Sequence, residues 1–402
     1  MLFVKVKDFV NSGEIEIKTG PFGTQLKAHE YTREGTPVLN VRNLGFSDVR
    51  TDKLEYVGAD TTERLSIHLL REGDIVFGRK GAVERHSFIT AREDGWMQGS
   101  DCIRLRIQSN RINPRYLSYF FLTKKHQAYM MSACSHGTTM ASLNQGILEQ
   151  IVFPLPPREV QDRIVSILLS LDKKRDLNQQ INDNLEQQAA AYYSHLFIEN
   201  ASSEWREGTI SDLGTVVGGS TPSKAKPEYY TDHGIAWITP KDLSLNKSKF
   251  ISHGENDITE LGLKNSSAVI MPEGTVLFSS RAPIGYIAIA AGKVCTNQGF
   301  KSVVPAPNIG TAFVYYFLKH NLPTIEGMAS GSTFKEVSGS TMKSVPATIP
   351  DDVSLAQFDD FCRPIFNQQR TLEAQNQSLS SLRDSLLPKL MSGEIDVSDI
   401  EI

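Results

Sequence analysis

The chain has 402 residues, 40% of them hydrophobic, which suffices for two or three domains that each bury a core. Its 42 basic and 46 acidic residues give a formal net charge of −4, so no overall positive field indicates a nucleic-acid partner. No CxxC pair is formed by the four cysteines, Cys102, Cys134, Cys295 and Cys362, which argues against a zinc site and a disulfide framework. No apolar run is long enough to span a bilayer. We therefore expect a cytoplasmic protein with no membrane partner.

The first 155 residues are predicted to form a mixed globule with more strand than helix. Short β-rich runs near glycine, such as "GDIVFGRKG" from Gly73 and "CIRLRIQ" from Cys102, are typical of strands. The aromatic run "YLSYFFL" from Tyr116 favours a buried helix. "GDIVFGRK" misses the phosphate-loop pattern, because Arg79 and Lys80 stand where lysine and Ser or Thr are required. Nucleotide binding is therefore not expected.

Residues 156–200 are predicted as a long helix. Apolar residues recur every seven positions along one row, at Ile164, Leu171, Leu185 and Tyr192. A companion row contains Ile167 and Ile181. Lys174 and Asn178 interrupt this seam near its middle. Such polar positions can fix the register of a helix pair at some cost in stability.

Residues 201–350 are predicted to form a second mixed globule, with strands in "GTVLFSS" and "YIAIAAG" and a buried helix in "VYYFL". Residues 351–402 are predicted as a second long helix with a C-terminal tail. Its heptad row is Phe358, Ile365, Leu372, Leu379 and Leu386, with Phe361 and Leu382 on the companion row and Gln368 and Gln375 as polar interruptions. Pro364 removes a helix hydrogen bond, so this helix should start near it or bend there.

Both helical stretches are on the order of 40 residues long, far beyond the usual globular helix. We therefore expect the two helices to pack on each other. The alternative is that each helix lies only on its own globule.

The second half of the chain repeats the first. "GTTMASLNQG" from Gly137 matches "GSTFKEVSGS" from Gly331 at an offset of 194, and no gap is needed from 137 to 197. Upstream, "GDIVFGRKGAV" from Gly73 matches "GTVLFSSRAPI" from Gly274 at an offset of 201, and Gln98-Gly99 matches Gln298-Gly299 at 200. The front part of each half therefore tolerates insertions and deletions, whereas the back part does not.

Comparison of the halves argues against a catalytic site. Lys335 beside Glu336 would suit an acid–base pair, but the matching positions are Ala141 and Ser142. One active half beside an inactive half is the alternative. The chain also lacks a glycine-rich methyltransferase loop, the clustered carboxylates of a metal-dependent nuclease and histidine pairs at metal-ligand spacing. Catalytic and metal-binding residues are therefore not expected.

The repeat and the long helices together suit a device that reads two sites at a fixed separation. A helix of about 40 residues is roughly 60 Å long. Half-sites on one face of DNA recur about every 34–36 Å. The helices have the right length scale for DNA.

These motifs together resemble the specificity subunit of type I restriction-modification systems. The resemblance is carried over almost the whole chain by "SGSTFKEVSGS" ahead of a "PLPP"-type linker and a long helix, by "SSRAPIGYIAIA" and "NQGFKS", and by "TGPFGTQLK" at 19–27. It implies an α+β fold of two target-recognition globules, 1–155 and 201–350. Each is followed by a long helix, 156–200 and 351–402, and the two helices pair as an antiparallel coiled coil.

The resemblance also implies the partners. Double-stranded DNA would be read as two half-sites with a fixed gap, and two modification subunits would bring S-adenosylmethionine and methylate adenine N6. Restriction subunits would add ATP-driven translocation and cleavage. The chain itself would bind no cofactor and would not be an enzyme. The alternative is a helical scaffold whose globules bind protein rather than DNA.

Comparison of the halves divides the candidate DNA contacts into two groups. Positions that are basic or polar in both halves favour phosphate contacts, whereas positions that differ favour base contacts. The shared candidates are Arg42 with Lys241, Lys80 with Arg281, Gln98 with Gln298, Thr138 with Ser332, and Thr139 with Thr333. The divergent candidates are Arg79, Arg85 and Arg104 in the first half and Asn297, Lys301 and Lys335 in the second, and Lys27 is a further candidate. For each of them, a solvated surface charge or a turn residue is the alternative.

Overall fold

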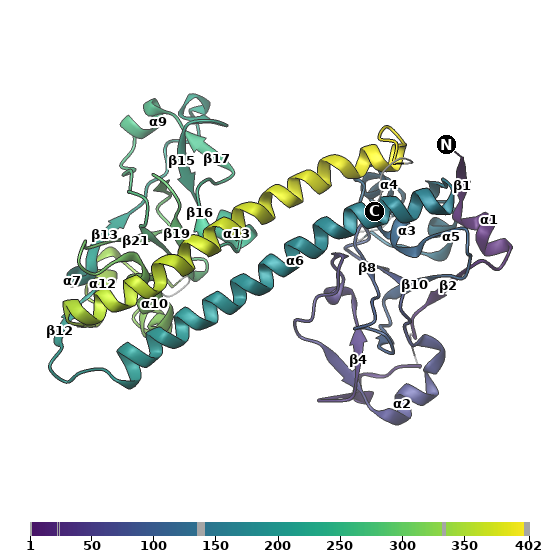
Figure 1. The fold of residues 1–402 in the computed structure, drawn as a ribbon, viewed down its shortest axis with the longest axis horizontal. Helices are drawn as coiled ribbons and strands as arrows, with labels where there is room; N and C mark the ends of the chain where they lie inside the picture. Colours follow the sequence, from purple (N-terminus) through teal and green to yellow (C-terminus); the bar gives the residue numbers. More distant parts are fainter. Residues whose placement is uncertain (1, 22, 24, 135–140, 332–334, 398–402) are drawn as a thin grey trace. The chain divides into compact units, whose positions relative to one another are not determined.

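The computed structural model describes residues 2–21, 23, 25–134, 141–331 and 335–397. The chain divides into two compact units. Unit 1 contains the residues up to Lys174 together with those from Leu379 onward, and unit 2 contains Arg175–Ser378. Each unit holds one globule and a segment of each long helix (Figure 1).

The globule of unit 1 contains a five-stranded sheet ordered β2-β10-β7-β8-β5, a four-stranded sheet ordered β3-β6-β4-β9 and the pair β1-β11. The strands are β1 (Phe3–Lys5), β2 (Ile15–Thr19), β3 (Tyr31–Thr32), β4 (Thr36–Leu39), β5 (Phe46–Ser47), β6 (Glu55–Val57), β7 (Ile75–Gly78), β8 (His86–Phe88), β9 (Met97–Gln98), β10 (Cys102–Ile107) and β11 (Val152–Pro154). The helices are α1 (Val6–Asn11), α2 (Ala59–Arg64), α3 (Pro114–Phe121), α4 (Lys124–Cys134) and α5 (Gln145–Glu149), with 3₁₀ turns η1 (Ala28–Glu30), η2 (Val41–Asn43) and η3 (Ser66–His68).

The globule of unit 2 repeats this topology, with sheets ordered β13-β21-β18-β19-β16, β14-β17-β15-β20 and β12-β22. The strands are β12 (Arg206–Thr209), β13 (Gly214–Gly218), β14 (Tyr230–Thr231), β15 (Ile235–Ile238), β16 (Phe250–Ile251), β17 (Asn256–Ile258), β18 (Val276–Ser280), β19 (Ile284–Ala290), β20 (Cys295–Thr296), β21 (Lys301–Pro305) and β22 (Pro346–Ile349). The helices are α7 (Ile210–Leu213), α8 (Pro240–Leu245), α9 (Glu260–Lys264), α10 (Thr311–His320), α11 (Leu322–Gly327) and α12 (Gly339–Lys343), with a 3₁₀ turn η5 (Pro227–Tyr229).

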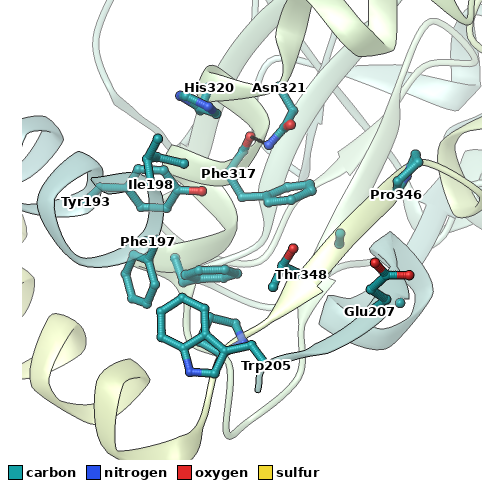
Figure 2. A pocket seen from close by; sticks show the side chains of 14 residues that line it. Tyr193, Phe197, Ile198, Trp205, Glu207, Phe317, His320, Asn321, Pro346 and Thr348 are labelled. Atoms are coloured by element: carbon teal, nitrogen blue, oxygen red, sulfur yellow. Dashed lines mark hydrogen bonds between the residues drawn. The ribbon is translucent and has the colours of Figure 1, made fainter. Parts of the chain in front are cut away.

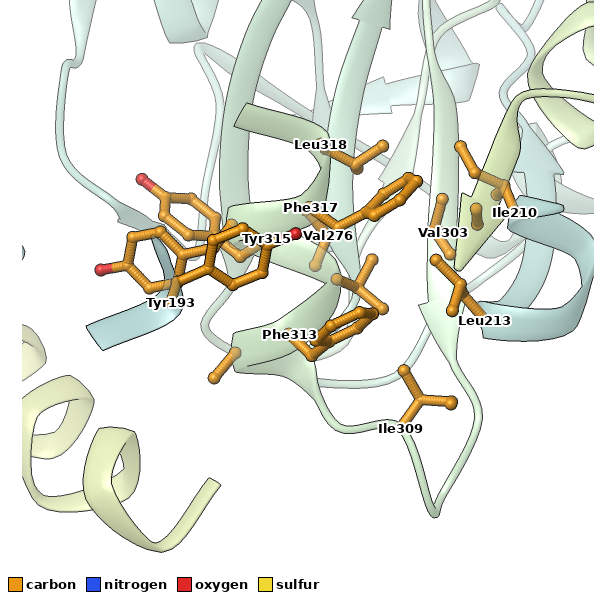
Figure 3. Close-up of a cluster of buried hydrophobic side chains, with 14 of the residues drawn as sticks. Tyr193, Ile210, Leu213, Val276, Val303, Ile309, Phe313, Tyr315, Phe317 and Leu318 are labelled. Atoms are coloured by element: carbon orange, nitrogen blue, oxygen red, sulfur yellow. The ribbon is translucent and has the colours of Figure 1, made fainter. Parts of the chain in front are cut away.

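The core of each globule forms where the predicted strands and the aromatic helix meet. β7 and β18 lie inside their sheets and are buried on both faces, as expected of continuous apolar runs. The aromatic runs form α3 and α10, and α10 packs Phe313, Phe317 and Leu318 against the strand residues Val276 and Val303 (Figure 3). Figure 3 also shows Tyr193, from a long helix, in this cluster. The two mixed globules predicted from the sequence are therefore confirmed.

The two long helices are α6 (Arg158–Ser194), which continues into a π-helical turn η4 (His195–Glu199), and α13 (Asp352–Ser392). In unit 1 the start of α6 shares a core cluster with the end of α13, through Ile164 and Leu390. In unit 2 the end of α6 shares a cluster with the start of α13, and the rings of Tyr193 and Phe358 lie 5.8 Å apart. The helices therefore pair in antiparallel fashion. In each unit, segments of both helices also pack on the globule of that unit.

The predicted main seam row is buried at four positions, Ile164, Phe358, Ile365 and Leu372. Its members Leu171, Leu185, Leu379 and Leu386 are half-buried. The predicted companion row is confirmed only in part. Ile167 is half-buried and packs against the unit 1 cluster, and the Phe361 ring lies 4.4 Å from that of Tyr192. Ile181, Phe361 and Leu382 are nevertheless at least 37% exposed. The buried companion positions lie one residue later, at Leu168, Asn182, Ala189, Cys362 and Gln369.

The polar residue Asn178 and the proline Pro364 are two further features of the long helices for which the sequence gives an expectation. Asn178 is fully buried, and its amide donates to Gln375 Oε1 at 3.3 Å and Asn376 Oδ1 at 3.0 Å across the helix pair. It is therefore a polar contact of the kind that can fix register. Of the two expectations for Pro364, a helix start near it is wrong, because α13 begins at Asp352 and includes Pro364. A bend at Pro364 stays a prediction.

Candidate nucleic-acid interface

The same backbone contact occurs in both globules, at the positions that the repeat pairs. Lys80 forms an isolated antiparallel bridge with Ser142, and Arg281 forms one with Glu336. Beside these bridges, Leu143 N donates to Arg79 O at 2.8 Å and Val337 N donates to Ser280 O at 3.0 Å. We call this contact the loop junction. It brings a basic residue after β7 or β18 next to the chain that follows the Gly–hydroxyl loop.

The hydroxyl residues of that loop lie outside the described residues. They are Thr138, Thr139, Ser332 and Thr333. Their predicted phosphate contacts therefore stay predictions. The loop junction fixes only where the following chain returns to the globule.

In unit 2 the Gln-Gly pair lies next to the loop junction, because Ser280 N donates to Gly299 O at 2.8 Å. The matching pair of unit 1 is Gln98-Gly99. Gly99 N donates to Leu39 O at 3.0 Å, and a Cβ on Gly99 would come within 2.6 Å of that oxygen, so the turn requires glycine. Gln98 is fully buried and its amide donates to Lys18 O at 2.8 Å and Cys102 O at 3.1 Å. We correct the expectation for Gln98, because its side chain holds strand ends together and is not accessible to DNA.

In unit 2, two of the predicted contacts face the same carboxylate. Glu336 lies 3.7 Å from both Arg281 Nη1 and Lys301 Nζ. Lys301 Nζ also reaches the carbonyl oxygen of Gln298 at 3.5 Å, and the exposed Gln298 side chain accepts a hydrogen bond from Thr221. Asn297 Oδ1 accepts from Gly299 N at 2.9 Å, which shapes the turn. Lys335 is exposed beside this group.

In unit 1 the matching place is built from different residues. Lys80 lies 3.8 Å from Asp101, and Arg79 N donates to the carbonyl oxygen of Asp101 at 2.8 Å. Arg85 lies 3.7 Å from Glu84 and 5.7 Å from the centre of the Phe46 ring. Arg79 and Arg85 are half-buried, whereas Lys80 is exposed. The two loop junctions thus share a basic residue and differ in the side chains around it.

Arg104 is a second correction. Its side chain is 1% exposed, donates to Glu16 at 2.9 Å and to the carbonyl oxygen of Leu69 at 3.2 Å, and lies 4.0 Å from Asp74. A charge buried this deeply must be paired inside the protein. Arg104 therefore belongs to the core of the five-stranded sheet and not to a DNA-contacting surface.

The remaining candidates lie beside the four-stranded sheets. Arg42 follows β4 and pairs with Glu55 at 2.9 Å, and Lys241 follows β15 and pairs with Glu255 at 2.5 Å. Lys27 is exposed just before η1. The pairing of Arg42 and Lys241 from sequence thus corresponds to two exposed ion pairs at equivalent places. The carboxylates in these pairs carried no pattern that the sequence could reveal.

Other chemistry finds little support in the described chain. Among the residues described, no three His, Cys, Asp or Glu side chains lie where they could hold a metal ion. All four cysteines are free and buried, and burial raises the pKa of the Cys102 and Cys295 thiols to about 12. No helix in the described ranges has the length and apolar character needed to cross a membrane.

Unit 2 also contains a cavity of about 350 Å³ beside η4 (Figure 2). Its walls include the aromatic side chains of Tyr193, Phe197, Trp205 and Phe317. The predicted DNA contacts are not among the described residues that line it. The cavity is therefore separate from the loop junction.

Comparisons with known proteins give a consistent result. The family model described as "Type I restriction modification DNA specificity domain" matches residues 25–187 and 202–361. The MjaIX specificity subunit of Methanocaldococcus jannaschii is 41% identical over 179 residues, which are 42% of this chain and 41% of that protein. The HindI specificity subunit of Haemophilus influenzae is 22% identical over 403 residues, covering 81% and 87% of the two chains.

A solved structure has the same fold. The crystal structure of a type I restriction-modification system S subunit from M. genitalium matches 99% of this chain and 96% of its own, with a TM-score of 0.60 and 16% identity. At this identity the match concerns the fold alone. It covers both globules and both long helices.

Proposed function

Because the chain belongs to the family of type I restriction-modification specificity subunits, we propose that it reads a bipartite DNA sequence with a fixed gap. Recognition of DNA sequence for a restriction-modification system is the role of this family, and catalysis belongs to other subunits. The observation that carries the bipartite proposal is the loop junction, which recurs with the same bridge in both globules. Two equivalent surfaces with different side chains suit two half-sites of different sequence.

Each globule would use shared and divergent residues differently. Lys80 and Arg281 hold the same place and would contact phosphates. Asn297, Lys301 and Lys335 in unit 2, against Arg79 and Arg85 in unit 1, would contact base edges. The paired Glu336 and Asp101 would keep the cations ordered before DNA arrives. The shared residues would thus give affinity, and the divergent residues would give sequence preference.

The long helices would act as the spacer between the half-sites. α13 contains 41 residues, which corresponds to a helix about 60 Å long. A continuous helix resists bending over this length far better than a loop. The gap between half-sites should therefore be fixed rather than variable.

The catalytic equipment would come from partners. Two modification subunits would bind S-adenosylmethionine and methylate adenine N6, restriction subunits would cleave, and this chain would bind no cofactor. Leu177 and Ile181 support a protein partner, because they lie four residues apart on α6 and are 49% and 37% exposed. Apolar side chains at such positions are suited to packing against another helix.

Mapping N6-methyladenine in the genome of cells that carry this chain tests the proposal. We expect a bipartite motif with one gap length, and deletion of the chain should remove that motif. A continuous motif would contradict the two-half-site reading. If deletion of the chain leaves the methylation pattern unchanged, the alternative of a scaffold whose globules bind protein is favoured.

A further inference from the structure

A buried lysine joins the second globule to both long helices. The Lys249 side chain is 6% exposed and immediately precedes β16. Its Nζ forms an ion pair with Glu186 of α6, donates to Gln369 Oε1 of α13 at 2.7 Å and to the Tyr316 hydroxyl of α10 at 3.2 Å. Glu373 of α13 also accepts from the backbone N of Lys249 at 2.8 Å. One residue therefore ties a sheet edge to both helices.

Glu186 is the centre of this cluster. It accepts from the Tyr316 hydroxyl at 2.9 Å and pairs with Lys319 at 2.6 Å. Burial alone would raise the pKa of Glu186, but Lys249 and Lys319 outweigh it and hold that pKa well below its usual range. The carboxylate is therefore ionised at neutral pH and holds two lysines and a tyrosine. We call Glu186, Lys249, Tyr316 and Gln369 the Lys249 clamp.

Unit 1 contains a comparable cluster at the equivalent helix. Tyr119 of α3 matches Tyr316 of α10 in the repeat, and its hydroxyl donates to Asp172 Oδ2 of α6 at 2.7 Å. Arg383 of α13 donates to Asp172 Oδ1 at 3.2 Å. We call Tyr119, Asp172 and Arg383 the Asp172 clamp. It also joins a globule to both long helices.

The two clamps are not copies made by the repeat. At the offset of 194, Asp172 corresponds to Phe366 and Glu186 corresponds to Ser380. Both carboxylates come from α6, whereas the cations come from α13 in unit 1 and from the globule in unit 2. The same connection has thus been built from different residues. This indicates a requirement for fixing each globule on the helices.

We propose that the two clamps are positioning devices that set the gap between the half-sites, an inference that rests on the proposed function. A change of one base pair in the gap moves the second half-site about 3.4 Å along the DNA and roughly 35° around it. A globule that tilted on its helices would follow such a movement and accept several gaps. A globule held by buried hydrogen-bonded charges would accept one.

The test measures gap preference rather than affinity alone. The full chain, with the modification subunits that co-purify with it, is titrated with duplexes that carry both half-sites at the native gap and at gaps one and two base pairs longer or shorter. Glu186→Gln, Lys249→Met and Tyr316→Phe are compared with wild type. Asp183→Asn is the matched control. Asp183 lies on α6 three residues before Glu186, but it is exposed and accepts a hydrogen bond from Gln179 of the same helix.

Lys249→Met should reduce the preference for the native gap over its one-base-pair neighbours by about tenfold. Tyr316→Phe removes only a hydroxyl and should change the preference in the same direction, by a smaller factor, even if Lys249→Met folds poorly. Asp183→Asn should keep the wild-type preference. Binding to duplexes with only the first half-site should be the same in all variants.

A uniform loss of affinity at every gap, with the wild-type preference kept in folded Tyr316→Phe and Glu186→Gln, would overturn the proposal and leave bipartite reading intact. A wild-type chain without any gap preference would instead contradict the proposed function itself. The two failures are therefore distinguishable.

Discussion

At the scale of single residues, the arginines and lysines of this chain have two different roles. Lys80 and Arg281 are accessible and face carboxylates at 3.7–3.8 Å, and exposed pairs of this kind contribute little to stability. A DNA phosphate can therefore replace the carboxylate at low cost. The side chains of Arg104 and Asp74 are each 1% exposed and lie 4.0 Å apart, and Arg104 also donates to the carbonyl oxygen of Leu69. Removing one partner of such a buried pair typically costs about 3–5 kcal/mol of stability.

The accessible pair gives a prediction for DNA binding. Lys80→Gln or Arg281→Gln should weaken binding to all sequences and reduce the slope of log affinity against log salt by about 0.9, because one phosphate contact is lost. Titration of a specific and an unrelated duplex between low and moderate salt measures both effects. Lys7→Gln, an exposed lysine on α1, serves as the control and should leave the slope unchanged. An unchanged slope in Lys80→Gln and Arg281→Gln would remove both residues from the phosphate contacts.

The buried histidines give a prediction for pH. Burial lowers the pKa of His86 to about 3 and of His126 to about 4, whereas both would titrate near 6.5 in the unfolded chain. Below pH 6.5 the unfolded chain therefore binds protons that the folded chain does not. As the pH drops from 6.5 toward 4, the free energy of unfolding should fall with a slope that approaches about 1.4 kcal/mol per pH unit for each histidine.

His126→Phe should remove one of these two contributions. The His126 ring packs against Phe121 at 4.7 Å, and its Nε2 is buried without a hydrogen-bond partner, so phenylalanine suits the site. Urea unfolding at pH 7, 6 and 5 should show that His126→Phe loses about 2 kcal/mol less stability than wild type between pH 7 and pH 5. Parallel curves for the two proteins would show that His126 titrates normally in the folded state.

At the scale of elements, a regular spacing of apolar residues predicts the buried positions of the long helices, and buried polar positions escape this prediction. The heptad row through Phe358, Ile365 and Leu372 is apolar and was identified correctly. Most of the companion row is misplaced by one position, because its buried members include Asn182 and Gln369, whose polarity hides them from a hydrophobic pattern. Apolar residues one position away, such as Ile181, took their place in the prediction.

At the candidate site, too, the sequence predicts some residues correctly and misses others. The repeat paired Lys80 with Arg281 correctly, since local motifs on both sides of each residue align. It said nothing of Asp101, Glu336 or the clamps, whose members are far apart in sequence and share no spacing. Gln98 and Arg104 were misassigned because residue type alone does not reveal burial. Ion pairs between distant segments are decided by tertiary packing, which a single sequence does not display.

At the scale of the whole molecule, the antiparallel helices give each unit a core made from distant parts of the chain. In unit 1, Leu387, Leu390 and Met391 near the end of α13 share a cluster with Tyr116 and Ile164. In unit 2, the start of α13 shares a cluster with the end of α6 and with α10. The recognition globules are therefore stabilised by the same helices that would space them. A defect in a helix end should act on one unit first.

Leu390→Ala tests this division. Leu390 is 2% exposed in the unit 1 cluster, and truncating a buried leucine costs about 2–5 kcal/mol. Trp96 reports on unit 1, and Trp205 and Trp237 report on unit 2. In urea, a Trp205→Phe, Trp237→Phe background should therefore show an earlier transition on adding Leu390→Ala, whereas a Trp96→Phe background should show the unit 2 transition unchanged.

Leu382→Ala is the matched control for this experiment, because Leu382 lies on the same part of α13 but is 46% exposed, and its truncation should change either transition by no more than about 0.5 kcal/mol. An equal shift of both tryptophan signals with Leu390→Ala would mean that the units unfold as one cooperative body. The continuous helices would then transmit the loss of one core to the other. A gap set by the helices would in that case depend on the stability of both globules at once, and not on each clamp separately.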